Sequence, residues 1–342
     1  MVQITIEEVR NKLFQASRIR GLPDKEAKIL ADYYLDANLR GAKTHGVGRF
    51  LVISEAIETR GGPPIIVKDT PVASLVDGQR DLGPLAAQFC VELLISKVKN
   101  NGIGLVALKN ASRYSHLAPY GSYIASKGYI GIVSNSAGPA AVAPYGSFTP
   151  ILGTNPLCIS FPSAEQSPIV MDFATSETVW GEIRQALLEG RDLKQNAFYT
   201  NDGKIAVHPE EANAVKSFDG AKGFALCLAI EIICGAFVGS KMGSLVNDEY
   251  ELGFLFMALD PMLFRENMED FKSEVGRLAQ EIRNASPLDI NMPVRLPGDH
   301  SLQEKEIREQ IGSIEIDEKS WDLLCLMSKD PKAGMISSQL TN

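Results

Sequence analysis

The sequence lacks the features that mark several large classes of protein. It has only five cysteines in 342 residues, widely spread and without a C-x-x-C pair, which argues against a structural zinc site and a disulfide-stapled secreted domain. It has no run of lysine and arginine, and 34 basic residues against 42 acidic ones give a net charge of −8. Nucleic acid and anionic membrane surfaces, which select basic proteins, are therefore not expected as partners.

Long apolar runs are also missing. The N-terminal sequence MVQITIEEVRNK contains no apolar core of a signal peptide. The longest apolar tract, residues 223–238, contains Glu231 and is too short to span a bilayer, so it favours a buried core helix over 223–237. We expect a cytoplasmic protein with reduced thiols and no bound metal.

The remaining composition and patterning indicate a globular α/β protein. Residues 1–64 read as helices, with capping-box spacing between Thr5 and Glu8, and end at the Gly/Pro cluster 61–64. Beyond it, apolar runs typical of strands alternate with helical patterns, which is the signature of an α/β fold. The predicted strands cover 72–76, 103–108, 130–133, 158–161, 169–173 and 254–259, with helices over 84–99 and 268–284 and a turn at Asp77-Gly78.

Two glycine clusters resemble nucleotide-binding loops but stand in the wrong context. Residues 102–107 formally fit G-x-G-x-x-A, yet they follow a helix and open a strand, whereas a phosphate loop must follow a strand and open a helix. A helix C-cap explains Gly102 better. Residues 46–48 fail the same test, and no G-x-x-x-x-G-K-[ST] motif is present. A nucleotide, if bound, does not use a standard loop.

The four histidines divide into two pairs. His208 and His300 lie in polar stretches and are predicted to be surface residues. His45 and His116 follow predicted elements, where catalytic groups often lie, although an ordinary structural histidine is an open alternative for each. Arg49 lies four residues after His45. An arginine can hold a carboxylate while a histidine moves a proton, so this group suits a 2-oxo or 2-hydroxy acid; a surface ion pair is the alternative for Arg49.

Three further features suggest a ligand without requiring one. Residues 134–156 are uncharged and rich in Gly, Pro, Ser and Asn, which indicates buried irregular backbone satisfied either by a ligand or by a lid. Asp172 ends an apolar strand, where it could orient a histidine, hold a ribose hydroxyl or bind a backbone amide. Lys222 begins a helix against its dipole, which a cofactor phosphate or a nearby carboxylate would offset.

Five segments in order resemble one family. AKTHGVGRF, GTNP, the strand ending in DFATS, KGFALCLAIEII and RLPGD together are similar to the malate/L-lactate dehydrogenase-like oxidoreductases, over about residues 4–326. The resemblance implies a non-Rossmann α/β fold in which a helical N-terminal segment (1–64) and a C-terminal helical segment (301–342) pack together on a core of residues 65–300. It also implies NAD or NADP as cofactor, a homodimer, and a small carboxylate substrate.

The resemblance also assigns roles to particular residues. His116 takes the position of the general acid/base, and His45 and Arg49 line the substrate site. The residues at the family's cofactor-contact positions are Thr44, Ser136, Asn155, Asp172, Phe173, Ala174 and Lys222. Of these, the resemblance places Asn155, from the GTNP segment, in the wall near the nicotinamide.

The sequence departs from the family around His116. The usual lead-in is replaced by Arg113-Tyr114-Ser115, and the residues after the histidine are Leu117 and Ala118 rather than Phe-Gly. The named substrate therefore does not transfer. We expect an NAD(P)-dependent oxidoreductase of a 2-oxo or 2-hydroxy acid. A reductase of cyclic imino acids, or a nicotinamide-binding protein that has lost catalysis, is the alternative.

Overall fold

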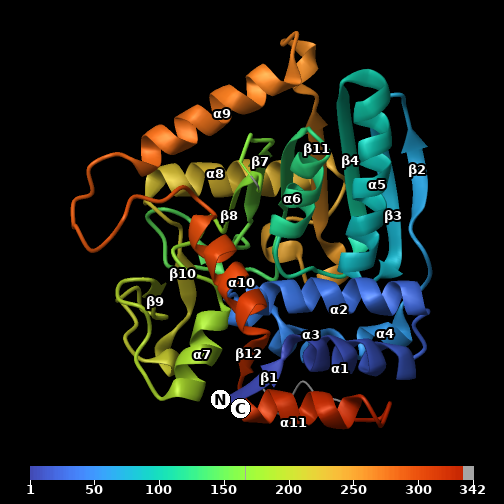
Figure 1. Ribbon diagram of the computed structural model, residues 1–342. Coiled ribbons are helices and arrows are strands. Elements are labelled where there is room, and N and C mark those ends of the chain that lie inside the picture. Colours follow the sequence, from blue (N-terminus) through green and yellow to red (C-terminus); the bar gives the residue numbers. More distant parts are fainter. Residues whose placement is uncertain (166, 334–342) are drawn as a thin grey trace.

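A seven-stranded mixed sheet forms the centre of the computed structural model, which describes residues 1–165 and 167–333 (Figure 1). The α/β class and the six predicted strands are confirmed. Only β3 and β4 run parallel, and the other neighbouring strands are antiparallel. In spatial order the strands are β2 (Ile65–Asp69), β3 (Ala73–Asp81), β4 (Ile103–Ala111), β11 (Gly253–Leu259), β5 (Ile130–Asn135), β7 (Leu157–Phe161) and β8 (Ile169–Phe173).

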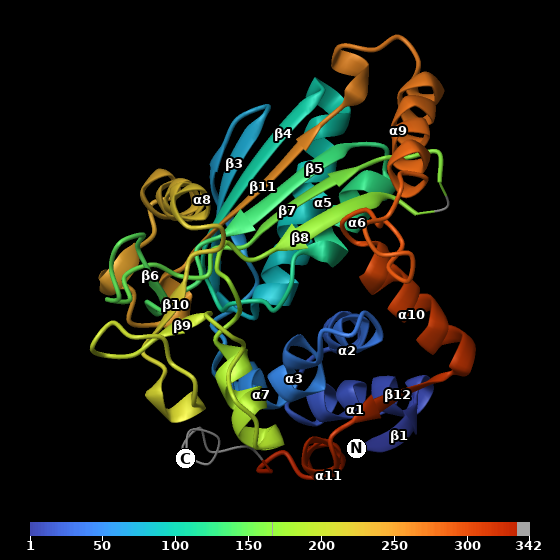
Figure 2. The ribbon, with the colours of Figure 1, turned by 90° about the vertical axis from the view of Figure 1, so that its left-hand side faces the viewer.

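Helices cover both faces of this sheet, as Figure 2 shows. One face carries α5 (Gly83–Asn101) and α6 (Ala118–Ser126), and the other carries α8 (Ala221–Ile232) with the π-helical turn η3 (Ile233–Phe237). The α5 helix ends at Gly102, whose φ of 76° and hydrogen bond to the Val98 carbonyl make it a C-cap. Gly102 is therefore a helix terminator, as predicted, and not part of a phosphate loop.

A helical layer lies beside one end of the sheet. It contains α1 (Ile6–Ile19), α2 (Asp24–Leu39), α3 (Val47–Ile53), α4 (Ala56–Thr59), α10 (Asp299–Ile311) and α11 (Glu318–Met327). The predicted cap is present, because Thr5 Oγ1 accepts a hydrogen bond from the Glu8 amide. The chain begins, however, with a strand: β1 (Val2–Thr5) pairs with β12 (Ser313–Ile316). Of the predicted segment 301–342, residues 334–342 lie outside the described part of the chain.

A small lobe with its own core lies next to the helical layer. It contains β6 (Val142–Ala143), β9 (Phe198–Tyr199), β10 (Ala214–Lys216) and α7 (Gly181–Glu189), which enclose Val142, Phe198 and Val215. The α7 helix contacts the short turn η1 (Lys43–His45). The helical layer and the small lobe therefore meet near His45.

Two expectations about burial hold only in part. The helix over 223–237 buries Ile230 and Cys234 against the sheet but exposes Leu228, Ile232 and Phe237. The uncharged stretch is likewise open at Tyr145, Phe148 and Ile151. Absence of charge therefore marked surfaces that this single chain leaves uncovered.

One further prediction is wrong, and one helix is confirmed. Asp77-Gly78 is not a turn but lies within β3, whose pairing with β4 shifts register between Asp77 and Asp81. The predicted helix over 268–284 is α9 (Met268–Arg283). Among the described residues, no helix has the length and apolarity needed to cross a membrane.

Candidate active site

The loop that carries His116 is fastened to α2 by one hydroxyl. Tyr33 Oη accepts hydrogen bonds from the amides of Ser115 and His116, both at 2.8 Å, and donates to the His116 carbonyl at 2.9 Å. The Tyr33 and His116 rings also pack together, with their centroids 4.7 Å apart. Tyr33 thus fixes both the backbone and the ring plane of His116.

A carboxylate on the same helix orients the imidazole. Asp36 Oδ2 lies 3.3 Å from His116 Nε2 and accepts from Arg40 Nε at 2.6 Å, while Oδ1 accepts from Lys305 Nζ at 2.7 Å. Burial alone would raise the pKa of Asp36, but the His116 hydrogen bond and the charges of Arg40 and Lys305 hold it well below its usual range. Asp36 is therefore an anion that can stabilise a protonated His116.

The second ring nitrogen of His116 is left for another partner. Its Nδ1 is buried and has no hydrogen-bond partner among the described residues, and the side chain is only 9% exposed. Buried polar atoms are rarely left unsatisfied in proteins, and such exceptions often mark a ligand site. Nδ1 is thus the atom through which His116 can exchange a proton with a substrate.

Asp172 supports the same loop from the opposite side. At the end of β8, its Oδ2 accepts hydrogen bonds from the amides of Leu117 (2.9 Å) and Ala118 (2.7 Å), where α6 begins. Of the three roles that the sequence left open, the bond to backbone amides is present. One helix, α2, and one strand, β8, therefore hold His116 in place.

His45 and Arg49 lie on the same side of the site as His116. Thr44 Oγ1 is 2.8 Å from His45 Nδ1. Burial, together with the charges of His116 and Arg49, lowers the pKa of His45 to about 4. Three residues that the sequence singled out thus act on one another directly, and His45 is neutral near pH 7.

The site also contains residues that the sequence analysis did not select. Tyr33 and Asp36 face the His116 loop from α2, and Arg113 lies close to Glu249 beyond Arg49. A signal for Asp36 existed, because an aspartate three residues after Tyr33 falls on the apolar face of the predicted helix. Its partner, however, is 80 residues away in sequence and could not be read from spacing.

A cavity of about 950 Å³ opens beside this site, a size typical of cofactor pockets. It lies between β8, α6 and α10, and its walls include Asp172, Phe173, Arg40 and Lys305. His300, exposed as predicted, also lines it. The cavity therefore adjoins the Asp36 cluster directly, because Arg40 and Lys305 belong to both.

An aromatic contact leads from this cavity toward α8. The rings of Phe173 and Phe218 meet edge to face, with centroids 6.2 Å apart. Phe218 in turn packs on Gly223. A Cβ at position 223 would lie 1.7 Å from the Phe218 carbonyl oxygen, so only glycine fits there. Lys222 precedes Gly223 and is exposed at the start of α8, and Ala174 follows Phe173 in the chain.

Ser136 and Asn155 are buried and bonded within the protein. Ser136 Oγ accepts from the Gly253 amide at 3.0 Å. The Asn155 side chain accepts from the Ala137 amide at 3.0 Å and donates to Glu231 at 2.7 Å. Both side chains hold the backbone of the uncharged stretch together.

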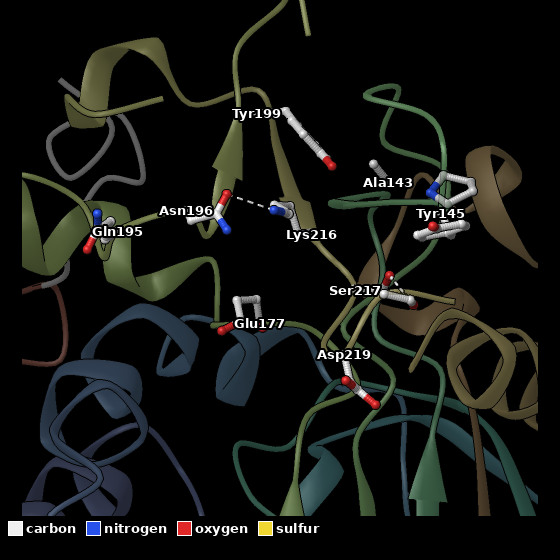
Figure 3. A pocket seen from close by; sticks show the side chains of 11 residues that line it. Ala143, Tyr145, Glu177, Gln195, Asn196, Tyr199, Lys216, Ser217 and Asp219 are labelled. Atoms are coloured by element: carbon white, nitrogen blue, oxygen red, sulfur yellow. Dashed lines mark hydrogen bonds between the residues drawn. The ribbon is translucent and has the colours of Figure 1, made fainter. Parts of the chain in front are cut away.

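A second cavity, of about 390 Å³, lies in the small lobe and contains none of the residues selected from the sequence (Figure 3). Lys216 extends into it, donates to Asn196 at 2.8 Å and lies over the Tyr199 ring. Glu177 and Asp219 come from other sides of the same cavity. Within it, Lys216 and Asn196 satisfy each other, whereas Nδ1 of His116 has no partner among the described residues.

Known proteins match this chain over most of its length. The family model described as malate/L-lactate dehydrogenase matches residues 4–325. An L-sulfolactate dehydrogenase of Methanocaldococcus jannaschii is 33% identical over 315 residues, which is 89% of this chain and 90% of the relative. A malate/(S)-sulfolactate dehydrogenase of Methanothermus fervidus is 32% identical, over 92% of this chain and 94% of the relative.

The solved structures agree with these matches. The sulfolactate dehydrogenase structure from Methanocaldococcus jannaschii superposes with a TM-score of 0.87 at 30% sequence identity, covering 95% of this chain and 96% of that chain. A family model over nearly the whole chain, relatives above 30% identity and the same fold lead to one conclusion: the chain belongs to the malate/L-lactate dehydrogenase family of oxidoreductases.

Proposed function

We propose that this protein catalyses reversible hydride transfer between a nicotinamide dinucleotide, NAD or NADP, and a small 2-oxo or 2-hydroxy carboxylate. One observation carries the proposal: His116 has a buried Nδ1 without a hydrogen-bond partner among the described residues, while Asp36 holds its Nε2. The charges of His116 and Arg49 both act on His45, so the three side chains form one group. The family and the names of the relatives support the same class of reaction.

In the reductive direction each residue has a distinct task. Arg49 holds the substrate carboxylate through its planar guanidinium. His116 donates a proton from Nδ1 to the carbonyl oxygen, and Asp36 stabilises the charged imidazolium before the transfer. When Thr44 donates to Nδ1 of neutral His45, Nε2 carries the proton and can polarise the substrate oxygen or hold the cofactor amide. The nicotinamide, when bound, supplies the hydride.

The cavity beside β8 fits a dinucleotide in size and chemistry. Arg40 and Lys305 offer cationic groups for phosphate oxygens, and Phe173 offers an apolar wall. We propose that Asp172, Phe173 and Ala174 line the cofactor site and that Lys222 contacts a phosphate beyond Phe218. Thr44 would reach the cofactor through His45, and Ser136 and Asn155 would shape the wall near the nicotinamide.

We further propose that the protein works as a homodimer through α8. An exposed apolar face on one helix, formed by Leu228, Ile232 and Phe237, is costly in water unless a partner covers it. A homodimer buries the same face from both subunits. We also propose a cytoplasmic location, because five widely spread cysteines do not suit a disulfide framework.

A panel of cofactors and substrates tests this function. NADH and NADPH are each mixed with the protein and pyruvate, oxaloacetate or a cyclic imine such as pyrroline-2-carboxylate, and absorbance is followed at about 340 nm. We expect turnover with at least one 2-oxo acid. Turnover restricted to the imine would favour the imino-acid reductase. Cofactor binding without any turnover would favour the non-catalytic alternative.

A further inference from the structure

Two arginines approach a single carboxylate at the edge of the substrate site. Arg49 comes from α3, Arg113 from the loop after β4, and Glu249 from the short helix η5 (Glu249–Glu251). Glu249 Oε2 lies 3.4 Å from Arg113 Nε and 4.0 Å from Arg49 Nη2. One carboxylate oxygen is therefore shared between two guanidinium groups that come from distant parts of the chain.

These contacts are poorer than those of a structural ion pair in the same protein. Arg283 binds Asp299 through two short contacts, 2.9 Å from Nε and 2.7 Å from Nη2. Arg113 Nε, by contrast, is buried without a hydrogen bond to any described residue, and 37% of the Arg113 side chain remains exposed. A guanidinium with an unsatisfied donor and open surface is prepared to receive another anion.

The positive charges of the two arginines also repel each other. Burial lowers the pKa of Arg113, and the positive charge of Arg49 lowers it further, against the opposing effect of Glu249. Keeping two like charges this close costs free energy unless an anion compensates for them. The arrangement is therefore expected to favour binding of negative charge.

Building on the function proposed above, we propose that Arg113 is a second substrate-binding arginine, and that the site selects 2-oxo acids carrying a second acidic group. The first carboxylate binds Arg49 next to His116, and the second acidic group binds Arg113 in place of Glu249. The lead-in Arg113-Tyr114-Ser115 thereby determines specificity.

A charge balance supports a dianion. Arg49 and Arg113 share Glu249, which leaves one positive charge. Arg40, Lys305 and a protonated His116 carry three positive charges against the two carboxylates of Asp36 and Asp172, which leaves a second positive charge. Two positive charges facing the reacting centre complement a substrate with two negative groups better than a substrate with one.

The test compares oxaloacetate, a dianion, with pyruvate, a monoanion, in steady-state reduction. We expect the wild type to have the higher kcat/KM for oxaloacetate. Arg113→Met should reduce the oxaloacetate-to-pyruvate ratio of kcat/KM by about tenfold or more, because a hydrogen bond between charged groups is lost. Arg113→Lys should retain part of the preference. Glu249→Gln should increase it, because the competing carboxylate is gone.

Arg80→Met is the matched control. Arg80 lies over the Tyr250 ring and 3.5 Å from Asp248, so it contacts the same segment from its exposed side. It should keep the wild-type ratio. A change of less than about twofold in Arg113→Met, or an equal change in Arg80→Met, would show a merely structural role for Arg113 and overturn the proposal.

A binding measurement separates this inference from the proposed function. If the wild type reduced neither oxo acid, the proposed function would fail, and calorimetry with tartronate (a dianion) and glycolate (a monoanion) would still judge Arg113. We expect tartronate to bind the wild type more tightly than glycolate, and this difference to shrink by about tenfold in Arg113→Met. Equal affinities in the wild type would overturn the inference.

Discussion

At the scale of single residues, the account depends on the pairing of His116 with Asp36. In the proposed mechanism, the Asp36 carboxylate determines which ring nitrogen faces the substrate and stabilises the protonated ring. Its loss should therefore lower kcat, although Asp36 itself does not contact the substrate. The two cations on Asp36 keep it ionised even though it is mostly enclosed.

Asp36→Asn should therefore lower kcat for 2-oxo acid reduction by about tenfold or more, since orienting partners of catalytic histidines have effects of this size or larger. The pH profile of kcat should change as well, which a purely structural substitution would not cause. Asp32→Asn is the control, because Asp32 lies on the same helix as Asp36 and forms only an exposed ion pair with Arg10 of α1. It should leave kcat and its pH profile unchanged. Equal kcat values and profiles for Asp36→Asn and the wild type would contradict the role of Asp36.

The lowered pKa of His45 predicts that the free energy of unfolding depends on pH. Its pKa falls from 6.5 to about 4 in the folded chain, so the unfolded chain binds this proton more readily between those values. The residue therefore favours folding above pH 6.5, and this contribution is lost as the pH falls toward 4.

Urea unfolding across this pH range measures the effect. His45→Gln should lose less stability than the wild type between neutral pH and pH 4, because it no longer carries the group with a lowered pKa. His208→Gln changes an exposed histidine and should follow the wild type. Parallel pH dependences for His45→Gln and the wild type would refute this reading of the buried histidine.

The sequence allowed some of these residues to be found and concealed others. His45, Arg49 and His116 were accessible because histidines are scarce and because local motifs match a family. Asp36 and Glu249 act only through partners that the fold brings together across 80 residues or more. Periodicity indicates which face of a helix is buried, but it does not indicate what that face meets.

At the scale of elements, one tyrosine joins α2 to the start of α6. Tyr33 satisfies two loop amides and one carbonyl, whereas the hydroxyl of neighbouring Tyr34 is buried without a hydrogen-bond partner among the described residues. Adjacent tyrosines thus provide an internal comparison between a bonded hydroxyl and an unbonded one.

Tyr33→Phe should reduce the free energy of unfolding by about 1–3 kcal/mol, because buried amides lose their acceptor, and it should also lower kcat by loosening the His116 loop. Tyr34→Phe, the matched control, should change the free energy of unfolding by less than about 1 kcal/mol. Urea unfolding and steady-state kinetics give both quantities. Equal losses in the two variants would show that ring packing, rather than the hydroxyl bonds, holds the loop.

Element prediction succeeded where apolar runs form central strands. The run of Phe254–Leu259 pairs on both sides with buried neighbours, so its pattern reflects its environment directly. β1 was missed because its partner, β12, lies more than 300 residues later and four residues give little periodic signal. The turn expected at Asp77-Gly78 failed because Asp77 still pairs with Lys109 in β4, and Gly78 lies in the register shift that follows within β3.

At the scale of the whole molecule, α8 is apolar on a face that this chain leaves exposed. Its apolar composition suits a buried helix, but in one chain only Ile230, Cys234 and their side of the helix are covered. A second subunit would provide the missing cover, and the hydrophobic pattern would then report on the dimer rather than on the single chain.

Light scattering after size-exclusion chromatography tests this assembly. We expect the wild type at twice the chain mass of 37.2 kDa, and Phe237→Asp at the mass of one chain, because a charge is then placed in the apolar face. Leu278→Asp alters an exposed leucine on α9 and should remain dimeric. A wild type at 37.2 kDa, or a dimer that tolerates Phe237→Asp, would rule out this interface.

In the function that we propose, the whole arrangement serves one proton transfer: the sheet supplies Asp172, the helical layer supplies Tyr33 and Asp36, and the loop between them supplies His116. Steady-state reduction of a 2-oxo acid by His116→Asn, with cofactor binding checked by fluorescence, tests this directly. We predict a loss of about 10²–10⁴-fold in kcat with cofactor affinity retained. A kcat within about threefold of the wild type would contradict His116 as the general acid/base.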